Sequence, residues 1–208
     1  MGSKIFGWFR SIDLKYEVKV PNEFDLNLKT SGGDLSAVNI SGDFSLNTSG
    51  GDIYLKHTKG DTKAETSGGD IILADHNGKS ELYTSGGDIE AVTESGDLIA
   101  NTSGGDIILS SSDGEISAKT SGGDIALKYS GENYGINLRT SGGDIDVRLP
   151  LDFNADVDLR TSGGDLTNNF SNNKMKKVTK SQLMGKFNDG GASFVCITSG
   201  GDITVLEK

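Results

Sequence analysis

One motif, Thr-Ser-Gly-Gly-Asp, recurs along almost the whole chain and strongly limits how the chain can fold. Its successive copies are separated by five intervals of 18 residues and then by intervals of 20, 21 and 37. A second glycine recurs between the copies with the same 18-residue spacing, from Gly42 to Gly114, so each unit divides into two short halves. A fixed period of this length is typical of a solenoid. The copies begin at Thr30, Thr48, Thr66, Thr84, Thr102, Thr120, Thr140, Thr161 and Thr198.

Each half-unit shows the alternation of apolar and polar residues that indicates a β-strand. Ile107 and Leu109 follow one motif, and Leu98 and Ala100 precede it, each pair separated by one residue. The motif threonine, here Thr102, is in phase with these apolar positions, so we expect a buried ladder of threonine hydroxyls. A nine-residue half is too short to hold a crossover helix as well. The sequence therefore predicts an all-β, single-chain parallel β-solenoid (a β-helix) with about 18 residues per rung.

Several properties of this solenoid stay open at this stage. Strand chirality favours right-handed coiling, but the spacing fits rungs with two faces or three. Successive rungs lie about 4.8 Å apart, so the seven intervals from Thr30 to Thr161 would span about 34 Å. The strict period argues against the disorder that a chain rich in glycine, serine and aspartate otherwise suggests.

Charge and composition exclude some classes of protein. The net charge of −10 opposes non-specific nucleic-acid binding, so we predict no nucleic-acid partner. The sequence contains no run of 18 apolar residues, so no transmembrane helix is predicted, and the first residues lack the features of a signal peptide. Cys196 is the only cysteine, so no intrachain disulfide is expected. The oligomeric state is not indicated by the sequence.

Three stretches of the chain together resemble a known family. They are the strand and proline that lead from Tyr16 to the first motif, the Ser-Gly-Gly-Asp-Ile rungs, and the glycine-rich end from Gly185 to Ile203. This combination is similar to the bacterial adhesin-like domain of unknown function called the Toastrack domain, over about 190 of the 208 residues. The resemblance implies a β-solenoid at the bacterial cell envelope or outside the cell, and it supplies no catalytic residues.

The resemblance and the repeat also suggest how the chain is divided. We expect residues 1–15 to form an N-terminal cap or linker and residues 16–208 to form the solenoid, with an insertion at about 167–192. Members of the family usually carry a signal peptide or another domain before the Tyr16 strand. This chain starts just ahead of that strand, so we expect a shortened N-terminus.

The motif aspartates are the most conspicuous candidates for chemistry. We expect each carboxylate to cap its own turn by accepting hydrogen bonds from nearby amides or from the motif serine. The alternative is a calcium-dependent binding module, because calcium prefers several oxygen ligands. The sequence departs from the calcium-binding repeat Gly-Gly-x-Gly-x-Asp, since the aspartate follows the glycine pair directly. The calcium candidates are Asp52, Asp70, Asp88, Asp106 and Asp124.

Other functions receive less support. An ice-binding protein needs a regular outward face, whereas the outward positions are irregular and charged. A polysaccharide-active enzyme needs clustered acidic and basic residues in irregular loops, and the opening intervals are uniform. His57 and His76 are predicted to lie in solvated turns, and Cys196 in the core. We therefore expect no enzyme activity and no cofactor.

Two segments could bind a partner. Residues 167–192 carry a net charge of +4 while the rest of the chain carries −14, and we expect a loop over the C-terminal end of the solenoid. Its lysines either are neutralised by the acidic body or contact an anionic envelope component. Trp8 and Phe9 either cap the open end or contact a membrane surface. The sequence predicts a non-catalytic envelope module that binds a protein or glycan. The lysines proposed to bind a partner are Lys174, Lys176, Lys177 and Lys180.

Overall fold

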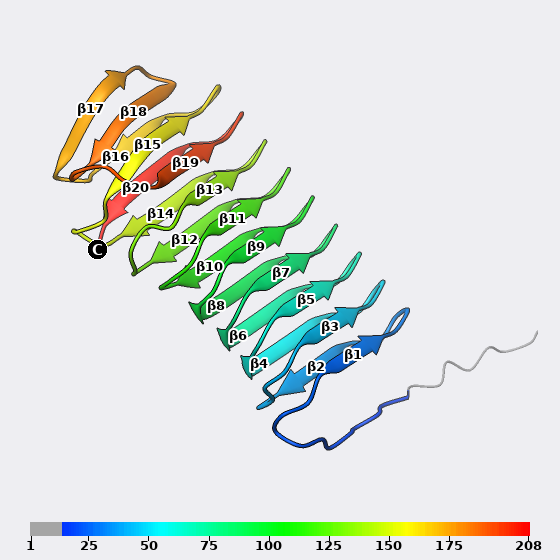
Figure 1. Cartoon of the computed structure of the whole chain (residues 1–208). Coiled ribbons are helices and arrows are strands. Elements are labelled where there is room, and N and C mark those ends of the chain that lie inside the picture. Colours follow the sequence, from blue (N-terminus) through cyan, green and yellow to red (C-terminus); the bar gives the residue numbers. More distant parts are fainter. Residues whose placement is uncertain (1–13) are drawn as a thin grey trace, which may run out of the picture.

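The computed structural model describes residues 14–208, which form a flattened β-solenoid made of two facing sheets (Figure 1). The larger sheet has 11 strands and the smaller has nine. Residues 14–208 contain no helix that could cross a membrane. In chain order, the larger sheet consists of β1 (Leu26–Lys29), β3 (Phe44–Asn47), β5 (Thr62–Glu65), β7 (Ser80–Tyr83), β9 (Leu98–Asn101), β11 (Ile116–Lys119), β13 (Ile136–Arg139), β15 (Ala155–Arg160), β17 (Asn173–Val178), β18 (Gln182–Phe187) and β19 (Ser193–Ile197). The smaller sheet consists of β2 (Leu35–Val38), β4 (Ile53–Lys59), β6 (Ile71–Asn77), β8 (Ile89–Ser95), β10 (Ile107–Ser111), β12 (Ile125–Tyr129), β14 (Ile145–Leu149), β16 (Leu166–Asn168) and β20 (Ile203–Glu207).

Each rung contributes one strand to each sheet, and neighbouring rungs pair in parallel and in register. Ile107 on β10, for example, lies between Ile89 on β8 and Ile125 on β12. Equivalent positions of the repeat therefore stack directly on one another. The predicted solenoid is confirmed, and the question of its cross-section is answered: each rung has two faces.

The core lies between the two sheets and follows the predicted alternation. Ile107 and Leu109 are buried from one sheet, and Leu98 and Ala100 are buried from the other. The residue between the first two, Ile108, is 53% exposed. Because every rung repeats this pattern, apolar side chains form continuous columns along the solenoid, and the hydrophobic effect holds each rung to its neighbours.

The turn between the sheets depends on the second glycine of each motif. A Cβ atom added at Gly87 would lie 2.1 Å from the carbonyl oxygen of Gly69 in the preceding rung. A Cβ atom added at the first glycine, Gly86, would meet no atom closer than 3.7 Å. The backbones of successive rungs thus approach too closely for a side chain at one position but not at the other.

The motif threonines from Thr48 onward are buried as predicted, while Thr30 in the first rung is only partly buried, and their hydroxyls do not bond to one another. The Thr66 hydroxyl donates a hydrogen bond to the carbonyl oxygen of Gly51 at 2.9 Å and accepts one from the amide of Gly69 at 3.3 Å. The prediction that the threonine hydroxyls bond to one another is therefore wrong, because they bond to backbone groups instead. Each threonine satisfies one backbone group of its own turn and one of the preceding rung, which joins the rungs at this edge.

The C-terminal part of the chain does not follow the order of the sequence. After β15 and β16, the strands β17 and β18 form an antiparallel hairpin, and β18 pairs with the outer side of β15. The chain then turns back, so that β19 lies between β13 and β15 and β20 lies between β14 and β16. Figure 1 shows β19 and β20 within the stack and the hairpin beyond it.

This arrangement corrects two expectations. The insertion forms a paired hairpin that extends the sheet, and not a loop folded over the end, because Leu183 and Phe187 on β18 bury apolar side chains against the core. The rung of Thr198 also lies between those of Thr140 and Thr161. The stack from Thr30 to Thr161 therefore contains one more interval than expected and spans about 38 Å at the usual strand spacing.

Candidate functional site

The motif aspartates form a regular ladder along one edge of the solenoid. The amide of Asp106 donates to Oδ1 of Asp88 at 2.7 Å, and the amide of Asp124 donates to Oδ1 of Asp106 at 2.8 Å. The ladder continues through Asp144, whose Oδ1 accepts the amide of Asp202. Every motif carboxylate except that of Asp165, which lies at the end of the ladder, accepts from the next rung in space, and not from its own turn as the sequence analysis predicted. The carboxylates are exposed.

This geometry gives the aspartates a structural task. One carboxylate oxygen of each motif aspartate other than Asp165 is already engaged by an amide, and a hydrogen bond to a charged acceptor is among the stronger ones. Among residues 14–208, no group of three or more histidine, cysteine or acidic side chains is placed to hold a metal ion. The calcium candidates Asp52, Asp70, Asp88, Asp106 and Asp124 all lie in this ladder, one per rung.

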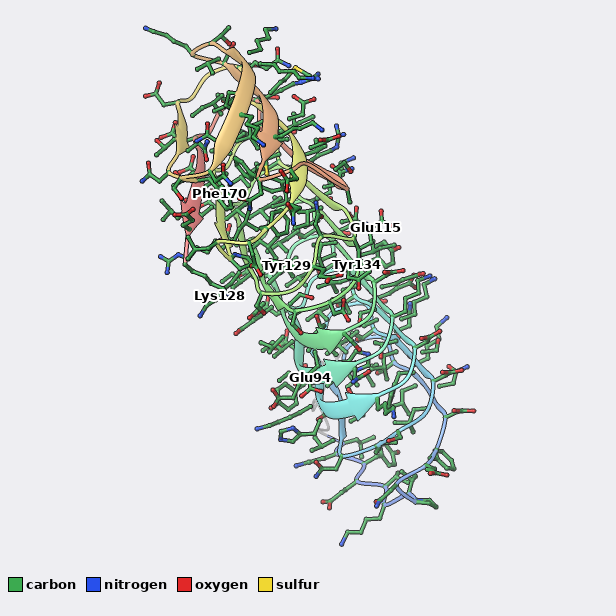
Figure 2. The ribbon with its side chains drawn as sticks, turned by 60° about the vertical axis from the view of Figure 1, so that its left-hand side comes forward. Glu94, Glu115, Lys128, Tyr129, Tyr134 and Phe170 are labelled. Atoms are coloured by element: carbon green, nitrogen blue, oxygen red, sulfur yellow. The ribbon has the colours of Figure 1, made fainter. Side chains whose placement is uncertain are left out.

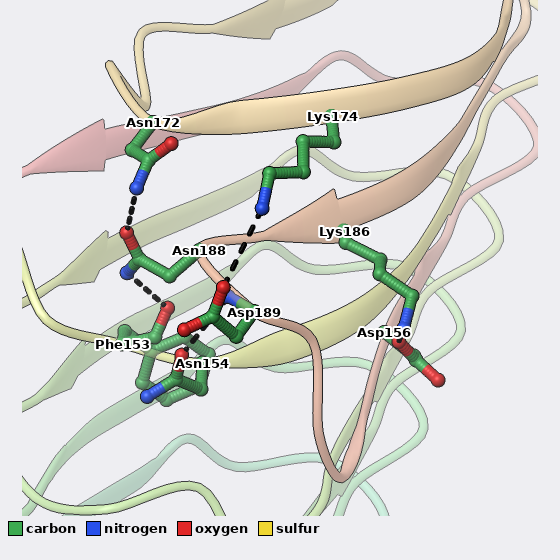
Figure 3. Close-up of polar contacts among 8 residues, drawn as sticks. All are labelled: Phe153, Asn154, Asp156, Asn172, Lys174, Lys186, Asn188 and Asp189. Carbon is green, nitrogen blue, oxygen red and sulfur yellow. Dashed lines mark hydrogen bonds and ion pairs between the residues drawn. The ribbon is translucent and has the colours of Figure 1, made fainter.

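The proposed partner-binding lysines all lie on or beside the hairpin β17–β18. Lys174 contacts Asp189 at 3.4 Å, and Lys186, on the other strand, contacts Asp156 at 3.5 Å (Figure 3). Lys186 thus contacts a carboxylate of the solenoid body, as one of the two expectations had it, whereas Lys174 contacts a carboxylate within the insertion itself. The remaining three are exposed and make no ion pair with any residue in the 14–208 range: Lys176, Lys177 and Lys180.

The loop from the hairpin back to β19 is held by asparagine side chains. Asn188 Nδ2 donates to the carbonyl oxygens of Leu151 and Phe153, both at 3.0 Å, and Asn188 itself has a φ of 49° (Figure 3). Asn133 Nδ2 donates to the carbonyl oxygens of Asn154 and Ala192. These contacts fix the position of the hairpin against the end of the stack. The sequence analysis missed them, because single asparagines in loops give no periodic signal.

Aromatic side chains fill the core beneath the hairpin. The rings of Phe170 and Phe187 stack with centroids 4.2 Å apart, and Phe194 on β19 lies 6.1 Å from both Phe187 and Phe153. Phe153 in turn packs edge-on against Tyr129. Figure 2 shows Phe170 at the hairpin end and Tyr129 further along the stack. This cluster closes the C-terminal end of the core and anchors the hairpin that carries the lysines.

Further cations lie in register on the outer faces of the sheets. On the larger sheet, Lys119 pairs with Arg139, and Ile197 separates Arg139 from Arg160. Arg160 is bonded to the carboxylate of Asp158. This row leads to the edge where β18 begins, because Gln182 is the register partner of Arg160. Sequence reasoning missed the row, since the insertion of β19 decides which side chains become neighbours.

The smaller sheet carries a similar pair of cations. Lys128, labelled in Figure 2, and Arg148 are register partners on β12 and β14, and both are exposed. They line a hollow of about 340 Å³ on the outer face, together with Ile108, Asp146 and Leu206. The hollow combines apolar and charged walls.

The two histidines differ in their surroundings. His57 is exposed as predicted and contacts Asp75 at 3.1 Å, but it lies within β4 and not in a turn. The prediction was wrong for His76, which is fully buried, with Nδ1 2.9 Å from the hydroxyl of Thr58. Burial lowers the pKa of His76 below its ordinary value, although the nearby Asp61 opposes this shift. Nε2 of His76 is buried without a hydrogen-bond partner among the described residues.

Two other candidates can be placed. Cys196 faces the core on β19 as predicted, and complete burial raises the pKa of its thiol well above the ordinary value. A buried thiol of this kind is a poor nucleophile. Trp8 and Phe9, which the sequence analysis assigned to an end cap or to membrane contact, lie outside the described residues.

These features define a repeat protein of the β-solenoid class, with an acidic edge and a basic hairpin at one end. The chain belongs to the Toastrack DUF4097 family, whose family model matches residues 2–206. This match confirms the resemblance noted in the sequence, and the family is one of unknown function. No curated protein and no solved structure matches the chain.

Proposed function

We propose that this protein is a non-catalytic, adhesin-like binding module of the bacterial cell envelope that uses the hairpin β17–β18 to hold an anionic partner. One observation carries the proposal: Lys176, Lys177 and Lys180 are exposed together at one end of an acidic protein, and none makes an ion pair within residues 14–208. A local positive field on a negatively charged protein attracts anions to that place and repels them elsewhere.

The support of the hairpin strengthens this proposal. The strand β18 is paired along its length with β15, and Phe187 is buried at its end. Lys176 and Lys177 lie on β17 and Lys180 lies in the short turn that joins β17 to β18, so the lysines are held by a supported hairpin and less conformational entropy is lost when a partner binds. The partner chemistry is a polyanion with closely spaced phosphate or carboxylate groups, which envelope lipids and acidic glycans both provide.

Binding to defined anionic probes tests this function. The protein is incubated at low salt with vesicles of phosphatidylglycerol and, separately, with an acidic polysaccharide, and bound protein is measured by co-sedimentation. We expect binding to at least one probe, and weaker binding as salt rises because exposed charges are screened. The two probes distinguish a lipid partner from a glycan partner. Absence of binding to both at low salt would contradict the proposal.

A matched pair of variants locates the contact. Changing Lys176, Lys177 and Lys180 to glutamine should lower the affinity at least tenfold without changing the melting temperature. The control changes three exposed lysines at the opposite end of the solenoid to glutamine and alters the net charge by the same amount: Lys15, Lys19 and Lys29. Equal loss in both variants would mean that the overall charge, and not the hairpin, governs binding.

A further inference from the structure

The rung formed by β19 and β20 is inserted between rungs that precede it in the chain. In the larger sheet β19 pairs with β13 on one side and β15 on the other, all in parallel. In the smaller sheet β20 pairs with β14 and β16 in the same way. If β19 and β20 were absent, the flanking strands would stand two strand spacings apart, about 9–10 Å. They could then make no hydrogen bonds with each other.

The inserted rung is bonded to both neighbours by the contacts that join every other pair of rungs. Thr198 donates its hydroxyl to the carbonyl oxygen of Gly143 at 2.9 Å, and Thr161 donates to that of Gly201 at 2.8 Å. The amide of Asp202 donates to Oδ1 of Asp144. None of these contacts depends on the two partners belonging to the same chain.

The register of this rung is specified by its own aromatic residue. Phe194 is fully buried between the register partners Ile136 and Val157, and its ring contacts those of Phe153 and Phe187. At the equivalent position of the middle rungs, the chain carries smaller residues such as Leu98. The space between the flanking rungs therefore fits residues 193–207 better than it fits another copy of the repeat.

The inserted rung is tied to the rest of the protein by a short connection. Residues 188–192 lead into β19 from the hairpin, and β20 ends at Glu207, next to the last described residue. Two glycines in this connection, Gly190 and Gly191, have φ values of 80° and 158°. Among the described residues, this rung connects to the other strands through residues 188–192 alone, so residues 193–208 can enter their place, or leave it, without moving another described strand.

From this topology we infer that the space between rungs β13–β14 and β15–β16 is a strand-receiving site that also accepts residues 193–207 of a second copy of this chain. Two copies that exchange these residues form a dimer in which each site is filled by the partner. The covalent connection favours filling by the same chain, with an effective concentration on the order of millimolar. Exchange of identical elements is therefore expected when the chains fold together at high concentration.

A disulfide between defined positions tests this inference with full-length chains. Leu138 on β13 is the register partner of Cys196 on β19, and the usual strand spacing of about 4.8 Å is within the range that a disulfide bridges. The acceptor chain carries Leu138→Cys with Cys196→Ser, and the donor chain has the native sequence. The two are unfolded together, refolded at high concentration with oxidised glutathione, and separated on a non-reducing gel.

The exchange predicts a disulfide-linked heterodimer joined through positions 138 and 196, identified by mass spectrometry of the linked peptides. Neither chain refolded alone should give this product, and neither should a mixture of the two chains folded separately. As a second measurement, light scattering of the native chain refolded at the same concentration should show a dimer fraction that declines on dilution before refolding. Monomers only, or dimers without the 138–196 link, would overturn the inference.

Discussion

The hydroxyl of Thr161 donates a hydrogen bond to the carbonyl oxygen of Gly201, a residue that lies 40 positions later in the chain. In the other rungs the direction is opposite: Thr48 donates to Gly33, 15 positions earlier. This reversed contact shows that the order of rungs in space differs from their order in the sequence. It also means that the rung of Thr161 is completed only by residues near the C-terminus.

The buried column of isoleucines should tolerate no charge. Changing Ile107 to aspartate would place an unpaired carboxylate between two neighbouring rungs, because Ile107 is fully buried between Ile89 and Ile125. We expect a loss of at least about 3 kcal/mol in the free energy of unfolding, measured by urea denaturation. The control is Ile108→Asp at the adjacent outward position, which should change stability little. Similar stability of the two variants would show that Ile107 does not face the core and Ile108 the solvent.

The two glycines of one motif should differ in their tolerance of a methyl group. In Gly87→Ala the new Cβ would lie within 2.1 Å of a backbone oxygen of the preceding rung, so the rungs must separate. In Gly86→Ala no atom is nearer than 3.7 Å. We expect Gly87→Ala to lower the free energy of unfolding by about 2 kcal/mol or more and Gly86→Ala to have a small effect. The melting temperatures of the two variants are compared in thermal melts. Equal melting temperatures would contradict the close approach of successive rung backbones at Gly87.

The aspartate ladder should stabilise the fold without a metal. We expect the same melting temperature in excess EDTA and in millimolar calcium, because a ligand that binds only the folded state would raise it. Asp88→Asn keeps an oxygen that can accept the amide of Asp106 and removes one charge from the ladder. This variant should be at least as stable as the native protein, whereas Asp88→Ala should be less stable. A large rise in melting temperature with calcium would instead support a cation site.

Stability should fall in mildly acidic solution because of His76. Burial lowers its pKa in the folded protein, so below the ordinary value of 6.5 the unfolded chain binds a proton that the folded chain does not. The contribution of neutral His76 is therefore complete above pH 6.5 and is lost as the pH falls from 6.5 toward the lower pKa of the folded state. Urea denaturation between about pH 7.5 and about pH 5, a range that extends to both sides of the ordinary value, should show this decline.

Two variants assign the decline to one histidine. His57→Gln changes the exposed histidine beside Asp75 and should keep the pH dependence. His76→Gln removes the titrating group and should flatten the profile over the same range. Glu65 and Glu81, whose pKa values are lowered by hydrogen bonds with Lys63 and Lys79, respond at more acidic pH and do not mask the effect. A profile unchanged by His76→Gln would refute the assignment.

Local periodicity explains which parts of this fold could be predicted. The alternation around Ile107 and the phase of the motif threonines correctly gave the buried residues, because each depends only on neighbours in the chain. The environment of His76 could not be obtained in this way. Asp75 has a φ of 56°, which interrupts the alternation and turns His76 inward. Asn39 and His57, at the same position of the two preceding rungs, also have positive φ values, but the alternation of apolar and polar residues does not indicate this irregularity.

The position of the rung that contains Thr198 could not be predicted for a different reason. The motif at Thr198 has the same five residues as the others, so the sequence offers no reason to place it before the motif at Thr161. The available signal was the concentration of aromatic residues near the C-terminus, including Phe170, Phe187 and Phe194, in a chain whose middle rungs use smaller side chains. Hence the hairpin lysines could be found from charge alone, but their support on β15 could not.

The inserted rung also has a consequence for how the protein is made. Synthesis proceeds from the N-terminus at about 5–20 residues per second, so residues 167–207 emerge about 2–8 seconds after β16 has begun to form. During that time the growing chain holds unpaired strand edges and uncovered apolar side chains on β13 to β16, which chaperones and proteases recognise. A chain that stops before Phe194 is left in that state permanently. The inserted rung therefore distinguishes chains that contain residues 193–207 from shorter ones, because only these residues cover the exposed edges and apolar side chains of β13 to β16.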